Sequence, residues 1–167
     1  MESKMAKKKA IITNAMRHLQ ASGVEFEAIE YECDGEIGED FGMQIAQKTG
    51  IQPEKSFKTL VVRGAKKGVM VACIPVCREV DLKKLAQAAG DKSVEMIHVK
   101  ELLGLTGYIR GGVSPIGMKK KYPTFIDESC LCFDTVAVSA GICGCTLLLD
   151  PEALIKECSA VTADIVR

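Results

Sequence analysis

A lysine within an apolar run is the most unusual candidate for chemistry in this sequence. Lys58 lies in the segment Phe57-Lys-Thr-Leu-Val-Val62, and the two-residue period of a strand puts it on the same face as Leu60. A lysine is rarely buried unless its charge has a partner. Lys58 therefore either projects into a cleft, where it would bind a phosphate, carboxylate or carbonyl group, or lies in an edge strand with its ammonium group in water.

A glycine-rich segment, Gly111-Gly-Val-Ser-Pro-Ile-Gly117, is the second candidate. Paired glycines adopt backbone conformations that other residues avoid, and they let a ligand approach the main-chain amides closely. Arg110 precedes this segment and Lys119-Lys-Lys121 follows it, with no acidic residue in between. This positive charge would attract phosphates. A simple turn is the alternative interpretation of the glycines and the proline.

The eight cysteines and two histidines form no metal-binding or catalytic motif. The sequence has no Cys-x-x-Cys, His-Glu-x-x-His, phosphate-binding loop or dinucleotide-binding glycine motif. We therefore expect no metal, no cofactor, and free thiols that are buried or without a role. Three pairs of cysteines lie close together in sequence: Cys73 and Cys77, Cys130 and Cys132, and Cys143 and Cys145. These pairs leave a thiol-based redox or metal protein as the alternative.

Composition excludes several functional classes. The 167 residues are 47% hydrophobic and 26% charged with a formal net charge of zero, which predicts one domain with a hydrophobic core. Aromatic residues make up only 5%, so we expect neither an aromatic platform for bases nor binding of DNA or RNA through bulk charge. No apolar stretch approaches the roughly 20 residues of a membrane helix, and no signal peptide is evident. We therefore expect a cytoplasmic protein with no membrane partner.

Hydrophobic periodicity predicts the elements that hold these residues. Helices are expected over residues 6–22, 40–49, 82–89 and 99–105, and from Pro151 onward. Strands are expected over residues 24–31, 57–62, 69–74, 94–97, 124–127, 135–139 and 146–149. Because strands and helices follow each other without regular alternation, the sequence predicts an α/β fold of the α+β type. We expect a single domain over residues 1–167, with a mixed β-sheet wrapped by helices.

Several segments, in a fixed order and spacing, carry a resemblance to a known family. They are Tyr31, Phe41-Gly42, Phe57–Val62, Asp81–Ala86, Thr106-Gly-Tyr108, Gly111–Lys120, Pro123–Asp127 and Val138–Gly141. Together they make nearly the whole chain resemble the YbaK family of trans-editing aminoacyl-tRNA deacylases, which is related to the editing domain of bacterial prolyl-tRNA synthetase. The resemblance implies a mixed α/β fold with a curled sheet around a cleft. It also implies release of a wrong amino acid from the 3′ end of tRNA, most often tRNA(Pro).

The resemblance further implies roles for single residues. Lys58 matches the lysine that the family needs for activity, and it would anchor the phosphate or ribose of the terminal adenosine. Residues of the glycine loop and of the surrounding segments would bind the substrate: Tyr31, Phe41, Thr59, Gly111, Gly112, Ser114, Pro115 and Ser139. The acceptor-stem phosphates would bind four basic residues: Arg110, Lys119, Lys120 and Lys121.

This assignment explains why the sequence has no catalytic triad. An aminoacyl ester is already activated, so correct positioning of a nucleophile can suffice for its cleavage. Amides of the glycine loop would stabilise the developing oxyanion. In the YbaK branch the nucleophile is the thiol of the substrate's own cysteine, which cyclises, whereas other branches use water.

The sequence departs from the YbaK branch after Ser139. Cys143 and Thr146 stand where that branch has an arginine and an aspartate. The change could relax or switch the choice of amino acid, although removal of Cys from Cys-tRNA(Pro) is the favoured activity. The partners would be aminoacyl-tRNA and prolyl-tRNA synthetase as a possible carrier. The alternative is a non-catalytic tRNA-binding or synthetase-associated module.

Overall fold

Two β-sheets form the framework of the protein. The computed structural model describes residues 11–34 and 36–167. The smaller sheet has the order β1-β7-β6, and its strands are β1 (Glu27–Glu30), β7 (Cys145–Leu149) and β6 (Val136–Ser139). The larger sheet has the order β4-β2-β3-β5-β8, and its strands are β4 (Val94–Met96), β2 (Phe57–Gly64), β3 (Gly68–Pro75), β5 (Thr124–Asp127) and β8 (Val161–Ala163).

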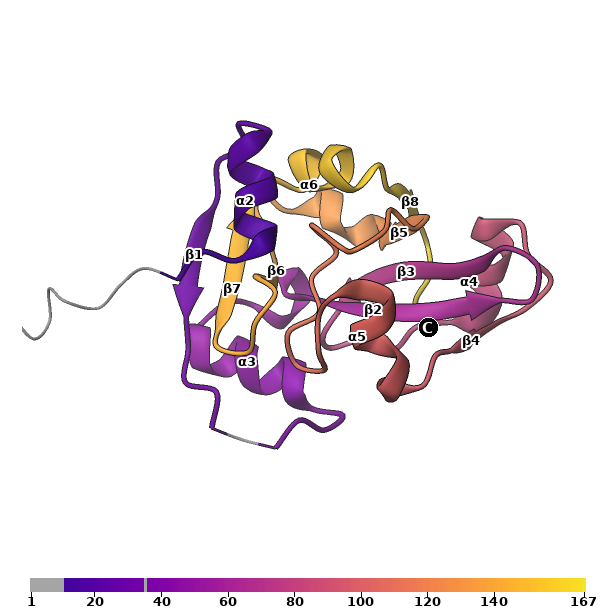
Figure 1. Cartoon of the computed structure of the whole chain (residues 1–167), viewed down its shortest axis with the longest axis horizontal. Coiled ribbons are helices and arrows are strands. Elements are labelled where there is room, and N and C mark those ends of the chain that lie inside the picture. The colour runs from indigo at the N-terminus through magenta and orange to yellow at the C-terminus, as the bar shows by residue number, and fades with distance from the viewer. Residues whose placement is uncertain (1–10, 35) are drawn as a thin grey trace, which may run out of the picture.

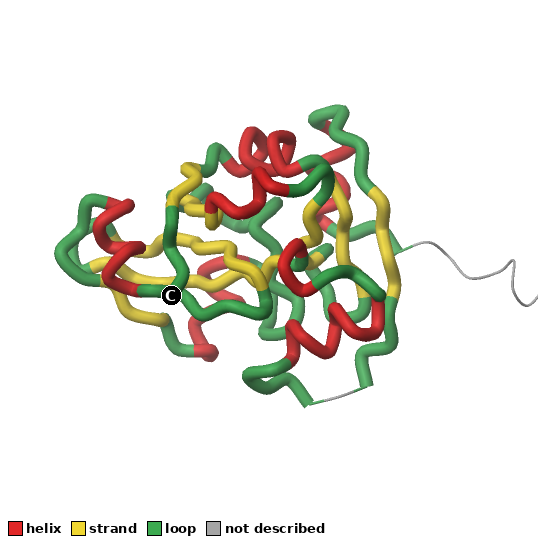
Figure 2. The backbone as a smooth tube through the Cα atoms, turned by 180° about the vertical axis from the view of Figure 1, so that it is seen from behind, coloured by secondary structure: helices red, strands yellow, loops and turns green. Residues whose placement is uncertain are grey.

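Helices surround the two sheets (Figures 1 and 2). The α-helices are α2 (Asn14–Ala21), α3 (Phe41–Thr49), α4 (Leu82–Ala89), α5 (Leu102–Thr106) and α6 (Pro151–Cys158). Short 3₁₀ helices occur at η1 (Pro53–Lys55), η2 (Val99–Glu101) and η3 (Glu128–Cys132). In Figure 1, α2 and α3 lie near the smaller sheet, and α4 lies at the far end of the larger one. No helix of the described residues is long and apolar enough to cross a membrane.

The larger sheet is mixed, and it is joined to the smaller sheet close to Lys58. Strand β2 pairs antiparallel with β3 and with β4, whereas the β3–β5 and β5–β8 pairs are parallel. A parallel bridge between Ser56 and Ala137 links the start of β2 to β6. The sheet therefore bends around this junction, and the predicted α+β fold with a curled mixed sheet is confirmed.

The core consists of two clusters, one on each face of β2 and β3. Phe57 and Cys73 pack with α2, α6 and the smaller sheet, while Val62 and Ile74 pack with α4 and the C-terminal residues. Each aliphatic side chain that is fully buried in these clusters contributes about 1.5–3 kcal/mol to the stability of the fold. By alternation, Lys58 lies on the same face as Val62, at the opposite end of the strand. The strand is therefore anchored on both faces, and this holds Lys58 in place.

Several expected boundaries differ from the structure. The helix expected over residues 6–22 is observed only from Asn14, because the Thr13 hydroxyl accepts a hydrogen bond from the amide of Met16 and caps the helix there; residues 6–10 lie outside the described part. The helix expected over residues 99–105 is a 3₁₀ turn followed by α5. Strand β8 was not predicted, because its three residues, one exposed and two half-buried, are too few to show an alternating apolar pattern.

Two cysteines are joined in a disulfide. Cys33 and Cys143 lie with their Cα atoms 5.8 Å apart and are bonded through their sulfur atoms. The expectation that all cysteines are free thiols is therefore wrong for this pair. Because the two residues are 110 positions apart, only the pairing of β1 with β7 brings them together. That pairing is invisible in the spacing of the cysteines along the chain.

Candidate functional site

A cavity of about 440 Å³ opens at the junction of the two sheets, between β2, α3 and the segment that begins at Arg110. Most of its wall is apolar, and the apolar side chains are Ile37, Phe41, Ile45, Phe57, Leu60, Val61, Val76, Met96, Ile97, Val99, Leu102 and Val113. The polar residues come from β2, β6, β7 and the segments between elements, and they are Tyr31, Glu39, Ser56, Lys58, Thr59, Arg110, Ser139 and Thr146. A cavity of this size with few polar groups is typical of a site for a small ligand or for the end of a larger one.

Lys58 is the one lysine among the described residues that line this cavity. Its side chain is half-buried, and it faces Ile74 across the β2–β3 pair. No ion pair of the described residues involves Lys58. A half-buried ammonium group with no protein partner can donate hydrogen bonds to an anionic ligand.

Two backbone amides of the glycine loop have no acceptor among the described residues, and both belong to residues that line the same cavity. Gly111 has a φ of 90°, which glycine adopts without strain, and the amide of Gly112 donates to the carbonyl of Ile109 at 2.9 Å. The amides of Gly111 and Val113 have no acceptor in the described part of the chain, and both residues line the cavity. These amides are therefore available to a ligand oxygen.

Close packing on both sides fixes this loop. A Cβ on Gly111 would lie 2.5 Å from Cδ1 of Ile37, and a Cβ on Gly112 would lie 2.8 Å from Cα of Ile142. Ile142 belongs to the turn between β6 and β7. The turn and the loop thus touch through backbone, and only glycine fits between them at position 112.

Tyr108 is a buried residue that holds the glycine loop in place. Its hydroxyl donates to the carbonyl of Ile116 at 2.5 Å, and its amide donates to the Thr106 hydroxyl at 3.0 Å. Its ring lies against Gly141, where an added Cβ would be 2.7 Å from Cε1. Burial raises the pKa of Tyr108 to about 12, so the neutral, hydrogen-bond-donating form persists at ordinary pH. Tyr108 therefore holds the glycine loop and the β6–β7 turn together.

The polar groups on the other side of the cavity are held by the smaller sheet. The amide of Tyr31 donates to the carbonyl of Gly144 at 2.9 Å, and burial raises the pKa of the Tyr31 hydroxyl. The Ser139 hydroxyl accepts from the amide of Gly141 at 3.1 Å, and the Thr146 hydroxyl donates to the carbonyl of Val138 at 2.9 Å. The Ser139 hydroxyl can still donate its proton to a ligand.

The cavity unites most of the predicted substrate-binding residues with Lys58. The predicted substrate-binding residues that line it are Tyr31, Phe41, Thr59, Gly111 and Ser139. Gly112, Ser114 and Pro115 do not. Ser114 is fully buried with its hydroxyl accepting from the amide of Ile116, and Pro115 lines a different cavity. These three residues shape the loop.

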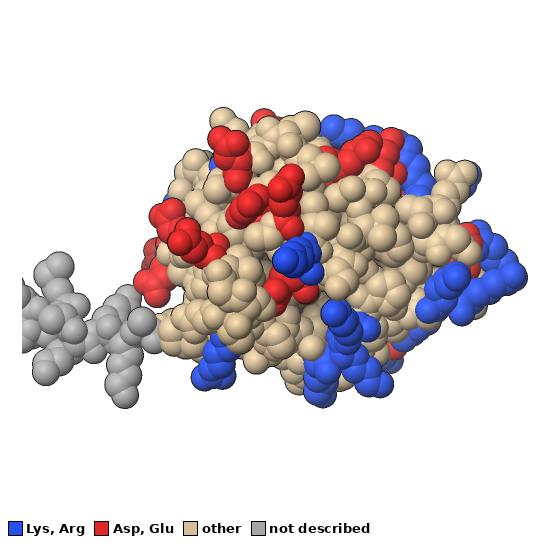
Figure 3. Space-filling view, turned by 90° about the horizontal axis from the view of Figure 1, so that it is seen from above, with Lys and Arg blue, Asp and Glu red and all other residues tan. Residues whose placement is uncertain are grey.

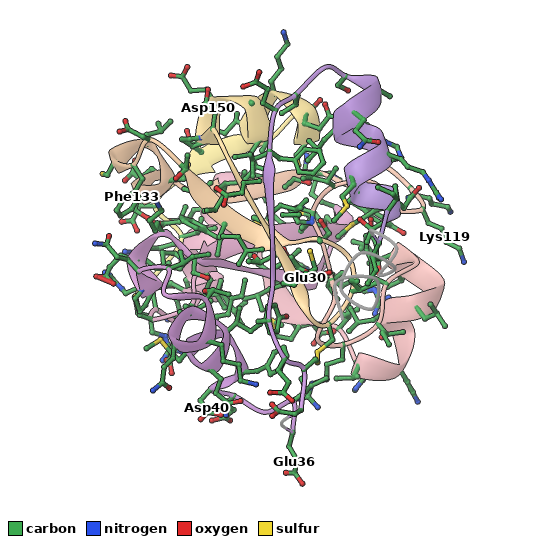
Figure 4. All side chains as sticks on the ribbon, turned by 90° about the vertical axis from the view of Figure 1, so that its left-hand side faces the viewer. Glu30, Glu36, Asp40, Lys119, Phe133 and Asp150 are labelled. Carbon is green, nitrogen blue, oxygen red and sulfur yellow. A yellow bond between two sulfur atoms is a disulfide. The ribbon has the colours of Figure 1, made fainter. Side chains whose placement is uncertain are left out.

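The predicted phosphate-binding lysines lie outside the cavity. Lys120 and Lys121 line a second cavity of about 870 Å³, together with Pro115 and with side chains of α2 and α6. Lys119 is exposed, and its ammonium group is 3.5 Å from the carbonyl of Gly104. Figure 4 shows Lys119 at the edge of the molecule, away from Asp40. Of the four basic residues, only Arg110 reaches the smaller cavity.

Sequence reasoning missed most of the apolar wall. Ile37, Met96 and Val99 come from an irregular segment, an edge strand and a 3₁₀ turn, which have no period that marks a ligand site. Val76 gives no sequence signal either, because its contact with Gly42 forms only in the folded chain. A Cβ added to Gly42 would be 2.6 Å from Val76 Cγ1. Across residues 11–34 and 36–167, no group of three or more His, Cys, Asp or Glu residues could hold a metal ion.

Comparisons with known proteins point to one class of activity. Residues 43–157 match the family described as the aminoacyl-tRNA editing domain. A protein of Enterococcus faecalis, named as a candidate Cys-tRNA(Pro)/Cys-tRNA(Cys) deacylase EbsC, is 45% identical over 162 residues, which cover 96% of this chain and 98% of that one. A proline–tRNA ligase of Thermosipho africanus is 32% identical over 77 residues, 46% of this chain and 14% of the ligase.

Solved structures share the fold. A candidate trans-editing enzyme for prolyl-tRNA synthetase superposes with a TM-score of 0.81, at 23% sequence identity, over 95% of this chain and 99% of that chain. At this level of sequence identity, the similarity shows a shared fold, that is, the same arrangement of sheets and helices.

Proposed function

Since this chain belongs to the aminoacyl-tRNA editing domain family, we propose that it deacylates mischarged tRNA and that its substrate is Cys-tRNA(Pro). One observation carries the proposal: a single cavity holds the unpaired Lys58 beside the free amides of Gly111 and Val113. The ammonium group suits a phosphate, and the amides suit an ester oxygen. The 3′ end of an aminoacyl-tRNA offers both groups.

The geometry supports a division of roles in the cavity. Lys58 binds the phosphate or ribose of the terminal adenosine and fixes the ester near the glycine loop. The amides of Gly111 and Val113 then stabilise the negative charge that develops on the carbonyl oxygen during attack. Tyr31 and Ser139 lie on the wall formed by the smaller sheet and bind the amino acid.

The bond that breaks is the ester bond between the amino acid and the terminal ribose. A nucleophile adds to the carbonyl carbon, and the bond from that carbon to the ribose oxygen breaks. The ribose oxygen takes up the proton that the nucleophile loses and leaves as a hydroxyl group. The described cavity residues include no cysteine and no histidine, so we assign the attack to the substrate's own thiol or to water.

The tRNA body extends from the cavity over the basic residues. Arg110 stands at the cavity, and Lys119 to Lys121 continue the same segment toward the second cavity. Phosphate contacts there would position the acceptor stem and weaken with salt. The chain resembles part of a proline–tRNA ligase, which supports prolyl-tRNA synthetase as the cytoplasmic partner that hands over the tRNA.

The decisive test is release of labelled amino acid from Cys-, Ala-, Ser- and Pro-tRNA(Pro) in single-turnover reactions. We expect fast release from Cys-tRNA(Pro) alone, and a loss of about 100-fold or more in the Lys58→Ala variant. Lys66→Ala is the matched control, because Lys66 is exposed in the β2–β3 turn and away from the cavity. Normal turnover by Lys58→Ala would remove Lys58 from the mechanism.

Two further arms separate the alternatives. A tRNA(Pro) carrying S-methylcysteine cannot cyclise, so its release would assign the attack to water, and its persistence would assign the attack to the thiol. Tight tRNA binding by the wild type without release from any substrate would identify a non-catalytic tRNA-binding module.

A further inference from the structure

We propose that the Cys33–Cys143 disulfide is a redox-active site whose reactants are thiols, and that closing it fixes the wall of the cavity. This proposal rests on the proposed function, because it concerns control of the same cavity. The disulfide itself does not line the cavity, and it acts by fixing the position of the β6–β7 turn.

The disulfide closes the smaller sheet at one end. Strands β1 and β7 pair from Glu27 to Glu30, and the ladder continues when the amide of Tyr31 donates to the carbonyl of Gly144. Cys33 follows this last backbone contact, and Cys143 lies in the β6–β7 turn. The covalent bond therefore fastens the turn where backbone pairing has ended.

The β6–β7 turn, which contains Cys143, packs directly against the glycine loop. Cα of Ile142 and the amide nitrogen of Cys143 would lie 2.8 and 3.0 Å from a Cβ on Gly112. Gly111 and Val113, on either side of Gly112, line the cavity. On either side of the turn, Ser139 and Thr146 line it too. A shift of the turn is thus passed through backbone contacts to the amides that are offered to the ester.

The accessibility of the cysteines makes exchange at this pair chemically reasonable. Cys33 is exposed and Cys143 is half-buried, whereas Cys73, Cys130, Cys145 and Cys158 are buried. Burial raises the pKa of these four thiols and keeps them protonated and unreactive. Exposed disulfides are the ones that thiols reduce readily.

The reaction balances with two equivalents of a thiol such as glutathione. A thiolate attacks Cys33 Sγ, the bond between the sulfur atoms breaks, and Cys143 leaves as a thiolate that takes up a proton. A second thiolate attacks the mixed disulfide and releases Cys33 as a thiol. The protein gains two electrons and two protons, and the two reductant molecules become one disulfide.

The test compares oxidised and reduced wild-type protein after the reagents are removed. Alkylation in denaturant should count six thiols in the oxidised form, matching the six free cysteines, and two more in the reduced form. Amide exchange should be about tenfold faster after reduction at Tyr31, Gly112 and Gly141, whose amides donate to the Gly144 carbonyl, the Ile109 carbonyl and the Ser139 hydroxyl. With enzyme in excess over Cys-tRNA(Pro), the protein concentration for half-maximal rate should rise about fivefold on reduction.

Variants separate the redox site from general effects. Cys33→Ser should behave as the reduced protein under all conditions, and Cys132→Ser, which removes an exposed free thiol, should keep the full redox response. Equal thiol counts in the two forms, or equal amide exchange and equal half-maximal concentrations, would overturn the proposal. Because amide exchange needs no substrate, a redox response in exchange without any deacylation would support the redox site and contradict the proposed function instead.

Discussion

The segment from Arg110 to Lys121 separates two cavities of opposite character. Its first part, with Gly111 and Val113, lines the smaller cavity of about 440 Å³, whose wall is largely apolar. Its second part, from Pro115 onward, lines the larger cavity of about 870 Å³, where lysines and acidic side chains are mixed. The fully buried Ser114 stands between the two parts.

The contrast explains how one chain can bind a highly charged molecule and still perform chemistry on a small, nearly neutral group. Because the wall of the smaller cavity is largely apolar, each donor there acts more strongly on a developing charge than it would in bulk water. The lysines of the larger cavity are exposed, so we expect salt to screen them and their contribution to be to affinity for tRNA rather than to rate. In Figure 3, most acidic side chains of the visible face gather toward the upper left and most basic ones along its lower and right-hand edges.

After Lys58→Ala, the largest effect is expected from Gly112→Ala, which disturbs the smaller cavity. The new Cβ would lie 2.8 Å from the backbone of Ile142, so the loop must move away from the turn and carry the Gly111 and Val113 amides with it. We expect the single-turnover rate of Cys-tRNA(Pro) deacylation to fall about 100-fold, the loss typical of a missing oxyanion donor. Affinity for uncharged tRNA should stay close to that of the wild type.

Gly104→Ala is the control for that prediction. A Cβ at Gly104, in α5, meets no atom within 4 Å, and alanine favours the helix by up to about 1 kcal/mol. Its deacylation rate should therefore equal the wild-type rate. A Gly112→Ala variant with normal rate would show that the loop amides do not contact the ester.

A smaller effect, on affinity for tRNA, is expected when Lys119, Lys120 and Lys121 are all replaced by alanine. The dissociation constant for tRNA should rise about tenfold, and the slope of affinity against salt should fall by about one unit for each lost phosphate contact. The deacylation rate of the bound substrate should stay unchanged, because none of the three lysines lines the smaller cavity. Lys83→Ala, on the exposed face of α4, is the matched control. An unchanged slope would place the tRNA on another surface.

The comparison also shows what the sequence could and could not predict. A β-branched run with apolar residues on both faces predicted the strand over residues 57–62, which is observed within β2. The capping Asp81 with the closing Gly90 predicted α4 over Leu82–Ala89 as observed. Local patterns of this kind depend on neighbours in the chain. The disulfide between Cys33 and Cys143 depends on the β1–β7 pairing, and local patterns say nothing about it.

The same division applies to the site. Lys58 stood out because a charge in an apolar strand is unusual, and Gly111 because paired glycines are. Ile37 and Met96 are ordinary apolar residues, and only the folded chain brings them to one cavity. Sequence therefore singles out candidate chemical groups more readily than the apolar residues that shape the space around them.

The smallest effect is expected from Tyr108→Phe, because Tyr108 supports the smaller cavity without touching the ligand. The substitution leaves the buried carbonyl of Ile116 without its donor, which costs about 1–2 kcal/mol in the free energy of unfolding. The ring still packs on Gly141, so deacylation should slow only a few-fold, on the order of 2- to 5-fold. Urea unfolding and single-turnover rates measure the two effects.

The pH dependence identifies the hydroxyl as the cause. The folded-state pKa of Tyr108 is raised from 10.0 to about 12, so its stabilising contribution is complete below pH 10 and is lost as the pH rises toward 12. The difference in unfolding free energy between wild type and Tyr108→Phe should therefore shrink over that range, because the unfolded tyrosine ionises first. The cysteines that also titrate there are common to both proteins and cancel in the difference. A difference that stays constant with pH would mean that the hydroxyl is not buried, and that the glycine loop has another support.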